Sequence, residues 1–289
     1  MPRPGLLPVS VVGLMITLLA GGAIWGVRAS RVVDTPVATT AVARTGLPAL
    51  RQEAVQLYAD GQFPLACERF HRAAHADPTS QALRQDVARC FEGWGWQTLR
   101  DGRAHEAALL FRFGLRAIPD DPGLLRGLGV ASIHEGRAQE AVGPLERVAG
   151  RGEAEVDVRL LLARLYHQRD EPDSAVRHLR AVLERAPEHP AAREFLDKVE
   201  RERHVEGRFD RLTTAHFVVK GRRGQNTAAQ RALLVALDAA WERVGAELRY
   251  RPAERLTVVL YDDEEFRAVT GAHGWVSGLF DGKIRLPLR

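Results

Sequence analysis

Lysine is almost absent from this chain of 289 residues. Lys198, Lys220 and Lys283 are the only lysines, so 41 − 3 = 38 of the basic side chains are arginine. The net charge is only +4, and acidic and basic residues interleave along the chain instead of forming a basic block. Proteins that bind nucleic acid normally carry a basic patch or stripe. The composition therefore predicts no nucleic-acid partner.

Cysteine is also scarce, with Cys67 and Cys90 as the only two. They flank Pro78 and Thr79, and an antiparallel helix pair that turns there would bring both cysteines to nearly the same height. An oxidising compartment would then permit a disulfide, worth about 3 kcal/mol for a loop of about 23 residues in the chain-entropy model. Two buried thiols that pack as small apolar side chains are the alternative.

Charged residues are missing from Gly5 to Val27, where apolar residues dominate. Such a run is about 34 Å long as a helix, enough for the ~30 Å hydrocarbon layer of a membrane. A cleaved signal peptide is the alternative, but its apolar stretch usually has about 7–15 residues and ends at small residues. The first such site, Ala41 to Ala43, lies well beyond the run.

We therefore predict a single transmembrane helix within residues 1–28, with residues 5–27 in the membrane, and a linker at residues 29–46. Arginines occur on both sides of the run, so the positive-inside rule leaves the orientation open. We expect the soluble part to lie outside the cytoplasm, in a periplasm.

A pattern recurs through the middle of the chain. Three segments read Gly-x-x-x-x-Ala, and a fourth has Asp in place of Gly: Gly61–Ala66, Gly102–Ala107, Gly136–Ala141 and Asp170–Ala175. The last three alanines are 34 residues apart, and the first interval is 41 residues. A large apolar residue follows each Ala by four positions: Phe70, Phe111, Leu145 and Leu179. Pro follows three of the four alanines by twelve positions: Pro78, Pro119 and Pro187. A fixed period of this length indicates a helical repeat.

Each residue type in the pattern suits a helix-turn-helix unit. Gly ends the first helix because it adopts positive φ at little cost, and the small Ala lets two helices approach closely. The pattern resembles the tetratricopeptide repeat, a 34-residue helical pair that stacks into a superhelix. This resemblance implies a mainly α fold, an α-solenoid of four units at residues 47–206 that ends in a capping helix at 190–206.

Repeats of this family form a groove from their first helices. Outward-facing positions of the first helices give seven candidates for the groove lining: Glu92, Trp96, Arg100, Arg126, His134, Arg164 and His167. The set is mixed but more basic than acidic, which suits an acidic peptide or a chain-terminal carboxylate of a partner protein. A merely solvated helix face is the alternative.

The periodicity changes after residue 206. Alternating and apolar runs predict strands, and two amphipathic runs predict helices. The predicted elements are strands at His216–Lys220 and Leu256–Tyr261, helices at Thr227–Leu248 and Asp263–Val269, and a hairpin at Trp275–Leu288 that turns at Asp281-Gly282. This order indicates a separate, small α/β unit at residues 208–289.

This unit resembles the beginning of the peptidase MA-like domain, a zinc peptidase fold of the gluzincin type. The resemblance rests on four segments: Thr214–Phe217, Leu256–Tyr261, Glu265–Phe266 and Gly278–Pro287. In that family the hairpin precedes a helix with His-Glu-x-x-His, whose histidines bind zinc and whose Glu is the general base. This chain reaches Arg289 without such a helix. A sheet that lacks one covering helix should expose an apolar patch.

One histidine pair has the spacing of a metal site. His71 and His75 are four residues apart, but Arg72 stands where the general base would be, and an arginine would repel a dication. His216 and His273 are isolated in the sequence. We therefore predict no catalytic residue, no metal site and no cofactor in this chain, with zinc only if a missing catalytic part is present.

Two functions remain. The first is a membrane-anchored scaffold that binds a protein or peptide in the repeat groove without catalysis. The second is the non-catalytic N-terminal part of a membrane-bound zinc metallopeptidase whose His-Glu-x-x-His helix lies beyond residue 289. We favour binding without catalysis.

Overall fold

The computed structural model describes residues 46–151, 155–222, 227–252 and 255–288. The chain divides into two units, unit 1 at Met1–Glu135 and unit 2 at Gly136–Arg289. The predicted anchor at residues 5–27 lies outside the described residues, as does the predicted linker except for Gly46. Within the described ranges, no helix is both long and apolar enough to cross a membrane.

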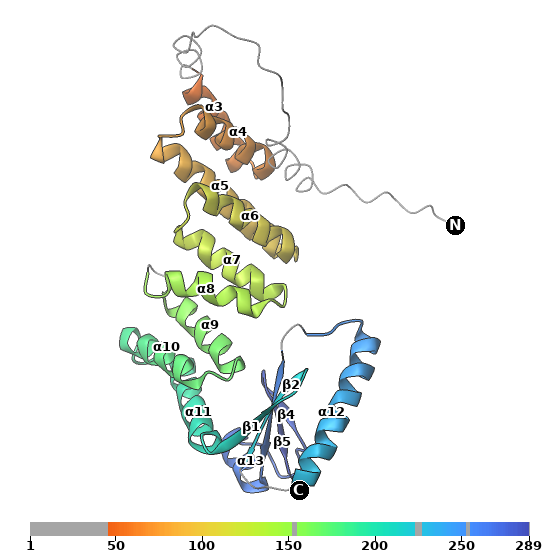
Figure 1. The fold of residues 1–289 in the computed structure, drawn as a ribbon. Coiled ribbons are helices and arrows are strands. Elements are labelled where there is room, and N and C mark those ends of the chain that lie inside the picture. Colours follow the sequence, from red (N-terminus) through yellow and green to blue (C-terminus); the bar gives the residue numbers. More distant parts are fainter. Residues whose placement is uncertain (1–45, 152–154, 223–226, 253–254, 289) are drawn as a thin grey trace, which may run out of the picture. The chain divides into compact units, whose positions relative to one another are not determined.

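Unit 1 is entirely helical where it is described. Its helices are α3 (Leu47–Ala59), α4 (Phe63–Ala76), α5 (Gln81–Arg100), α6 (Ala104–Ala117) and α7 (Pro122–His134), and each packs on the next (Figure 1). Ser80 and Asp121 cap the amino ends of α5 and α7 by accepting hydrogen bonds from the backbone N–H groups of Leu83 and Leu124.

The buried residues of unit 1 are those of the repeat pattern. Ala66, Ala107 and Phe111 are fully buried, and Phe70 is 4% exposed. A side chain at Gly95 would have its Cβ 2.6 Å from Cε1 of Phe111, so the aromatic ring occupies the space that this glycine leaves. The spacing in the sequence therefore reflects close helix–helix packing.

Unit 2 begins with four helices: α8 (Ala138–Val148), α9 (Glu155–Gln168), α10 (Pro172–Arg185) and α11 (Pro190–Glu206). Each packs on the next, and Ala141, Leu145, Ala175 and Leu179 are fully buried. The last helix has the bounds predicted for the capping helix.

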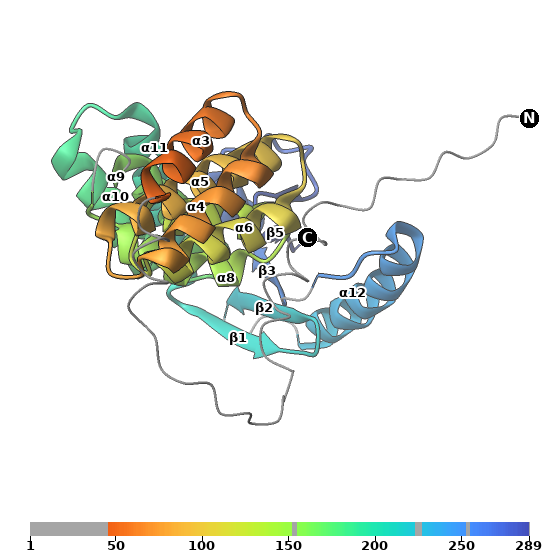
Figure 2. The ribbon, with the colours of Figure 1, turned by 90° about the horizontal axis from the view of Figure 1, so that it is seen from above.

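A sheet of five strands follows α11. Its strands are β1 (Phe209–Thr213), β2 (Phe217–Arg222), β3 (Leu256–Tyr261), β4 (Leu279–Phe280) and β5 (Ile284–Pro287), with helices α12 (Thr227–Leu248) and α13 (Asp263–Thr270) in the connections. The order is β1-β2-β3-β5-β4. β2, β3 and β5 are parallel, and β1 and β4 pair antiparallel at the edges. Figure 2 shows β1 beside β2 at one edge of the sheet.

The two faces of the sheet differ in character. Val219, Val258 and Leu260 belong to the apolar face, which packs against Leu237 and Trp241 of α12. Side chains alternate along a strand, so the neighbouring residues point to the opposite face. That face carries Lys220, Tyr261 and Arg285 and is covered by α11 and α13.

Most helices and strands of residues 208–289 were predicted from the sequence. The two predicted helices and the strands at 216–220 and 256–261 appear within two residues of the predicted bounds, and the hairpin turns where it was predicted. β1 was not predicted, and neither was the covering of the second face by α11. Trp275 and Phe280 are 81% and 69% exposed.

Candidate binding site

Six charged side chains form a buried ionic cluster between the helices of unit 2 and its sheet. We use this name for Asp170, Glu202, Glu206, Lys220, Lys283 and Arg285, each of which is at most 9% exposed. Asp170 follows α9, the two glutamates belong to α11, and the three cations belong to β2 and to the β4–β5 hairpin. Charges buried to this extent are stable only when they are paired and hydrogen-bonded.

Asp170 is the central acceptor of the cluster. Its Oδ1 accepts hydrogen bonds from Lys220 Nζ and Lys283 Nζ, both at 2.9 Å, and its Oδ2 pairs with Arg211. Burial by itself would raise the pKa of Asp170, but Lys283 and Lys220 lower it to about 2. The carboxylate is therefore ionised throughout the physiological pH range.

Asp170 also ends α9. Its φ is 60°, in the left-handed region that Gly61, Gly102 and Gly136 occupy at the equivalent helix ends. Glycine adopts this conformation at little cost, and Asp tolerates it better than most other residues. The fourth repeat has Asp170 where the other three repeats have Gly, and this aspartate places a carboxylate against the sheet.

The two glutamates of α11 both bind Arg285, and Glu206 also binds Lys220. Glu206 accepts hydrogen bonds from Lys220 Nζ at 2.7 Å, from the Tyr261 hydroxyl at 2.6 Å and from Arg285 Nη1 at 2.9 Å. Glu202 Oε1 lies 2.7 Å from Arg285 Nη2. Burial and the neighbouring Glu206 raise the pKa of Tyr261 far above its ordinary value, so its hydroxyl stays protonated as a donor.

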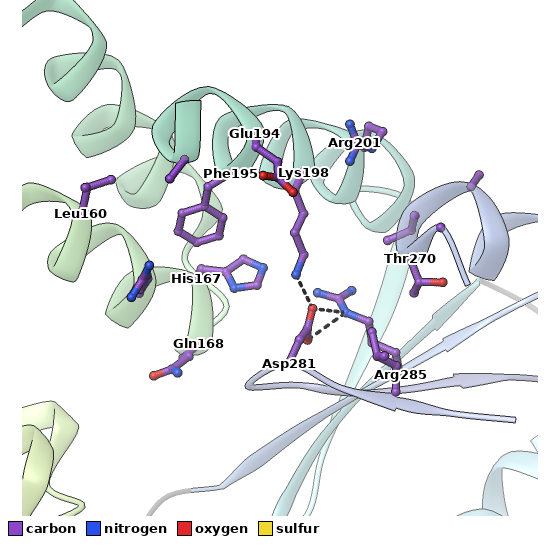
Figure 3. Close-up of a pocket in the computed structure, with 16 residues that line it drawn as sticks. Leu160, His167, Gln168, Glu194, Phe195, Lys198, Arg201, Thr270, Asp281 and Arg285 are labelled. Carbon is purple, nitrogen blue, oxygen red and sulfur yellow. Dashed lines mark hydrogen bonds and ion pairs between the residues drawn. The ribbon is translucent and has the colours of Figure 1, made fainter. Parts of the chain in front are cut away.

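A pocket of about 800 Å³ opens beside this cluster, and we call it the α9–α11 pocket (Figure 3). Its walls are α9, α11, the end of α13 and the β4–β5 hairpin. Leu160, Ala191, Phe195, Val269 and Leu279 supply apolar surface. Its charged lining residues are Arg164, Lys198, Arg201 and Arg285 with Glu194 and Asp281, so cations exceed anions by two.

Two of these cations are already paired. Lys198 Nζ donates to Asp281 Oδ2 at 2.6 Å, and Arg285 Nε lies 3.1 Å from both carboxylate oxygens of Asp281 (Figure 3). Burial opposes ionisation of Asp281, but Lys198 and Arg285 hold its pKa below the ordinary value. Arg164 and Arg201 are exposed and have no ion pair with any residue that the structure describes. They are the cations available to a ligand.

Five of the seven predicted groove residues belong to unit 1, and the other two, Arg164 and His167, belong to unit 2. Arg164 and His167 line the α9–α11 pocket, and Glu92 and Trp96 line a separate cavity in unit 1. The Arg126 guanidinium lies 5.4 Å from the Trp96 ring centroid. Arg100 and His134 are exposed and belong to neither of these two pockets. Ligand contact by these residues stays a prediction.

His167 differs from what its sequence position suggests. It is 3% exposed, and its Nε2 lies 2.6 Å from Glu202 Oε2. Its ring also contacts Phe195 of α11 edge-on, with 5.3 Å between the centroids. An outward-facing position on α9 is therefore covered by α11, and His167 supports the pocket wall.

Cys67 and Cys90 form a disulfide between α4 and α5, with 5.5 Å between their Cα atoms. Both are buried beside Phe70 and Phe91. Two helices at this separation satisfy the geometry of a disulfide.

Lys198, Arg201 and Asp281 were not predicted as parts of a site, and the ionic cluster was not predicted either. One signal was present, because all three lysines of the chain are in or beside the cluster. The three lysines could have been singled out because lysine is rare in this chain. Nothing in the sequence, however, indicated which acidic residues they would pair with.

Comparison with known proteins supports the repeat. Residues 132–199 match the family model of the tetratricopeptide repeat. No curated protein matches the chain. The chain is thus mainly helical, with a match to this repeat at residues 132–199 and a small C-terminal sheet.

Solved structures similar to the chain include the MamA protein, with 14% identity over 55% of this chain and 83% of that chain and a TM-score of 0.41. YrrB, described as a tetratricopeptide repeat protein with an unusual peptide-binding site, has 18% identity over 55% of this chain and 77% of its own, with a TM-score of 0.41. PilF of Pseudomonas aeruginosa has 20% identity over 53% and 66%, with a TM-score of 0.39.

Proposed function

We propose that this chain is a protein-binding scaffold whose α9–α11 pocket takes an acidic, partly apolar segment of a partner protein. The repeat match at residues 132–199 is consistent with a scaffold of this kind. It includes α9 and most of α11, the two helices that contribute the exposed arginines of the pocket.

The observation that carries this proposal is the placement of Arg164 and Arg201 around an apolar floor. Their guanidinium groups can each donate two parallel hydrogen bonds to a carboxylate, the strongest geometry for such a pair. Phe195 and Leu160 line the same pocket as the two arginines. They can pack against an apolar side chain of the partner's segment. An acidic residue next to Leu or Phe, or a chain-terminal carboxylate after such a residue, satisfies both features.

The buried ionic cluster supports the proposal because it fixes the walls of the pocket. Arg285 is tied to Glu202 and Glu206 of α11, and Asp281 is tied to Lys198. The hairpin wall and the helical wall are therefore held before a ligand arrives. A preorganised site loses less conformational entropy on binding than a flexible one.

Peptide binding to the full chain in zwitterionic lipid nanodiscs tests the proposal. A fluorescein-labelled peptide that ends in Glu and Leu with a free carboxylate should bind, and the same peptide with Gln and an amidated end should bind more weakly. Removing one exposed charge pair costs up to about 1 kcal/mol, so Arg164→Gln and Arg201→Gln should each raise the Kd about three- to fivefold.

Arg193→Gln is the matched control. Arg193 is an exposed arginine of α11 that donates to the Pro187 carbonyl, and it does not line the pocket. Its loss removes the same charge from the same helix. If Arg193→Gln weakens the peptide as much as Arg201→Gln, the effect is net charge alone and the pocket is not the site.

We further propose that residues 5–27 anchor the scaffold in a membrane, with the repeats on an oxidising, extracytoplasmic side. The uncharged apolar run supports the anchor, and the Cys67–Cys90 pair fits such a compartment. The anchor predicts that alkaline carbonate does not extract the chain from membranes. Release into the soluble fraction would contradict it.

A second candidate is the non-catalytic part of a zinc peptidase. It is favoured by the mixed sheet at residues 209–287, whose strands and hairpin occupy the segments that resemble a peptidase MA-like domain. The scaffold would then present substrates to a catalytic helix outside this sequence. The reading frame beyond Arg289 decides this, because only the peptidase requires a continuation into His-Glu-x-x-His.

A further inference from the structure

Unit 1 contains a cavity of its own, of about 660 Å³, which we call the α4–α6 pocket. It lies between the carboxyl-terminal halves of α4 and α6, and the first half of α5 forms its floor. Val87 and Phe91 of the floor are buried, and Phe113 of α6 stacks on Phe91 with 5.9 Å between the ring centroids. The interior is therefore apolar and largely aromatic.

Every titratable side chain that lines this pocket is basic. His71 and His75 come from α4, Arg84 from α5 and Arg116 from α6. Arg84 donates to the Pro78 carbonyl at 2.6 Å, and the Arg116 guanidinium lies over the Phe113 ring, 4.6 Å from its centroid. No acidic side chain lines the pocket in the part of the chain that the structure describes.

The histidine pair has two chemical interpretations. His71 and His75 lie one helical turn apart, with 4.6 Å between their ring centroids, which is the arrangement of two metal ligands on a helix. Arg84 and Arg116 would repel a dication there. The described residues also contain no group of three or more His, Cys, Asp or Glu that could hold a metal. The same two arginines attract an anion.

The basic residues near helix ends have an ordinary role that accounts for part of the charge. His75 and Arg116 lie in the last turns of α4 and α6, where cations offset the partial negative charge of the helix carboxyl end. These two interactions with the helix ends do not require a ligand in the pocket. The N–H groups of Arg116 have no hydrogen-bond acceptor among the described residues, and they border an aromatic surface.

We propose that the α4–α6 pocket binds a small aromatic carboxylate. The carboxylate is held by Arg116 with the imidazole N–H groups of His71 and His75, and the aromatic body lies on Phe91 and Phe113. The volume is within the range of small-molecule sites, about 300–1,000 Å³. The lining also has the usual composition of such sites, an apolar wall with a few convergent polar groups.

This site is independent of the proposed partner binding, because all its residues belong to unit 1 and none lines the α9–α11 pocket. His71 supports the site at neutral pH as a neutral donor, since burial and the neighbouring His75 lower its pKa.

Calorimetric titration of the full chain in zwitterionic nanodiscs tests this site with naphthoate as the probe, after subtraction of the signal from empty nanodiscs. Naphthoate should bind, and its neutral amide should bind at least about tenfold more weakly, as expected for the loss of charge-assisted hydrogen bonds. Arg116→Gln should raise the Kd of naphthoate about fivefold. Arg116 is exposed, so its substitution leaves the fold intact, as circular dichroism can verify.

Two control variants make the result specific. Arg112→Gln removes an equal charge from α6 at an exposed position outside the pocket, and Arg193→Gln removes one from α11 at an exposed position outside both pockets. Both should keep the wild-type Kd. The proposal is wrong if wild type does not bind naphthoate, if the amide binds equally well, or if either control loses as much affinity as Arg116→Gln. Binding of Zn²⁺ that His75→Gln abolishes, without naphthoate binding, would identify a metal site instead.

Discussion

Replacing Asp170 by Gly would restore the repeat pattern and nevertheless destabilise unit 2. The substitution relieves the left-handed backbone at φ 60°, which is worth about 1 kcal/mol for a residue with a side chain. It also removes the acceptor that Lys220 and Lys283 share. Breaking a buried ion pair from one side costs about 3–5 kcal/mol, because the remaining charges stay buried.

The pKa of Asp170 gives a second measure of the same interaction. Lowering it from 3.8 to about 2 corresponds to about 2.5 kcal/mol of stability at neutral pH. Lys220 keeps Glu206 at 2.7 Å, so the loss lies at the lower end of the range for buried pairs. We expect Asp170→Gly to lower the free energy of unfolding by about 2 kcal/mol and Asp170→Asn, which keeps the strain, by about 3 kcal/mol.

The pH dependence has a defined sign. A carboxylate whose pKa is lowered by folding stabilises the protein above its unfolded pKa and loses this effect as the pH falls through the folded pKa. The contribution of Asp170 is therefore complete above about pH 5, about half lost at pH 3 and gone below pH 2. The difference between wild type and Asp170→Asn should shrink accordingly between pH 7 and pH 3.

Hydrogen exchange of the β2 and β5 amides measures this locally, because a chain with two units need not unfold in one step. Asp173→Asn is the control, since Asp173 is an acidic residue near Asp170 whose side chain is 86% exposed and pairs only with Arg203 among the described residues. It should change stability by less than about 0.5 kcal/mol. An Asp170→Gly variant as stable as wild type would refute the reasoning.

Two further predictions concern packing and chemical reactivity. Gly95→Ala should lower the stability of unit 1 by about 1–2 kcal/mol, because the new Cβ would lie 2.6 Å from the buried Phe111 ring. Denaturant melts check this, and an unchanged midpoint would contradict it. An amine-acylating reagent should modify Lys198 in the native chain and spare Lys220 and Lys283, whose side chains are 10% and 2% exposed. Peptide mass spectrometry identifies the modified lysines. Equal labelling of all three would contradict the prediction, because it would show that the buried ionic cluster is open in solution.

The repeat was predictable from sequence because its determinants are local. Ala107 and Phe111 lie one turn apart on one helix, and Gly102 ends the preceding helix at φ 79°. Each residue acts within its own unit, so a fixed spacing is enough to recognise the structure. β1 had no comparable signal, because its residues Phe209 to Thr213 are an edge strand with mostly exposed side chains.

The candidate site was less predictable because it depends on contacts between distant segments. A helical wheel of α9 places His167 outside, but Glu202, 35 residues later, covers it. Lys283 meets Asp170 across 113 residues. Periodicity describes which face of one element is apolar, and it contains no information on which later element covers the polar face.

Departures from the local pattern mark the places where distant segments meet. At the fourth repeat, Asp170 replaces the glycine that the helix end prefers, and this substitution makes sense only through the cations that approach it from the sheet. The lysines are the second departure, in a chain whose other 38 basic side chains are arginine. Lys220 donates to Asp170 and Glu206, two carboxylates from different elements, and a compact ammonium with three rotatable donors suits this better than a planar guanidinium fork. The residues that a repeat pattern or a composition fails to explain are therefore the ones that join the last repeat to the sheet and shape the pocket beside it.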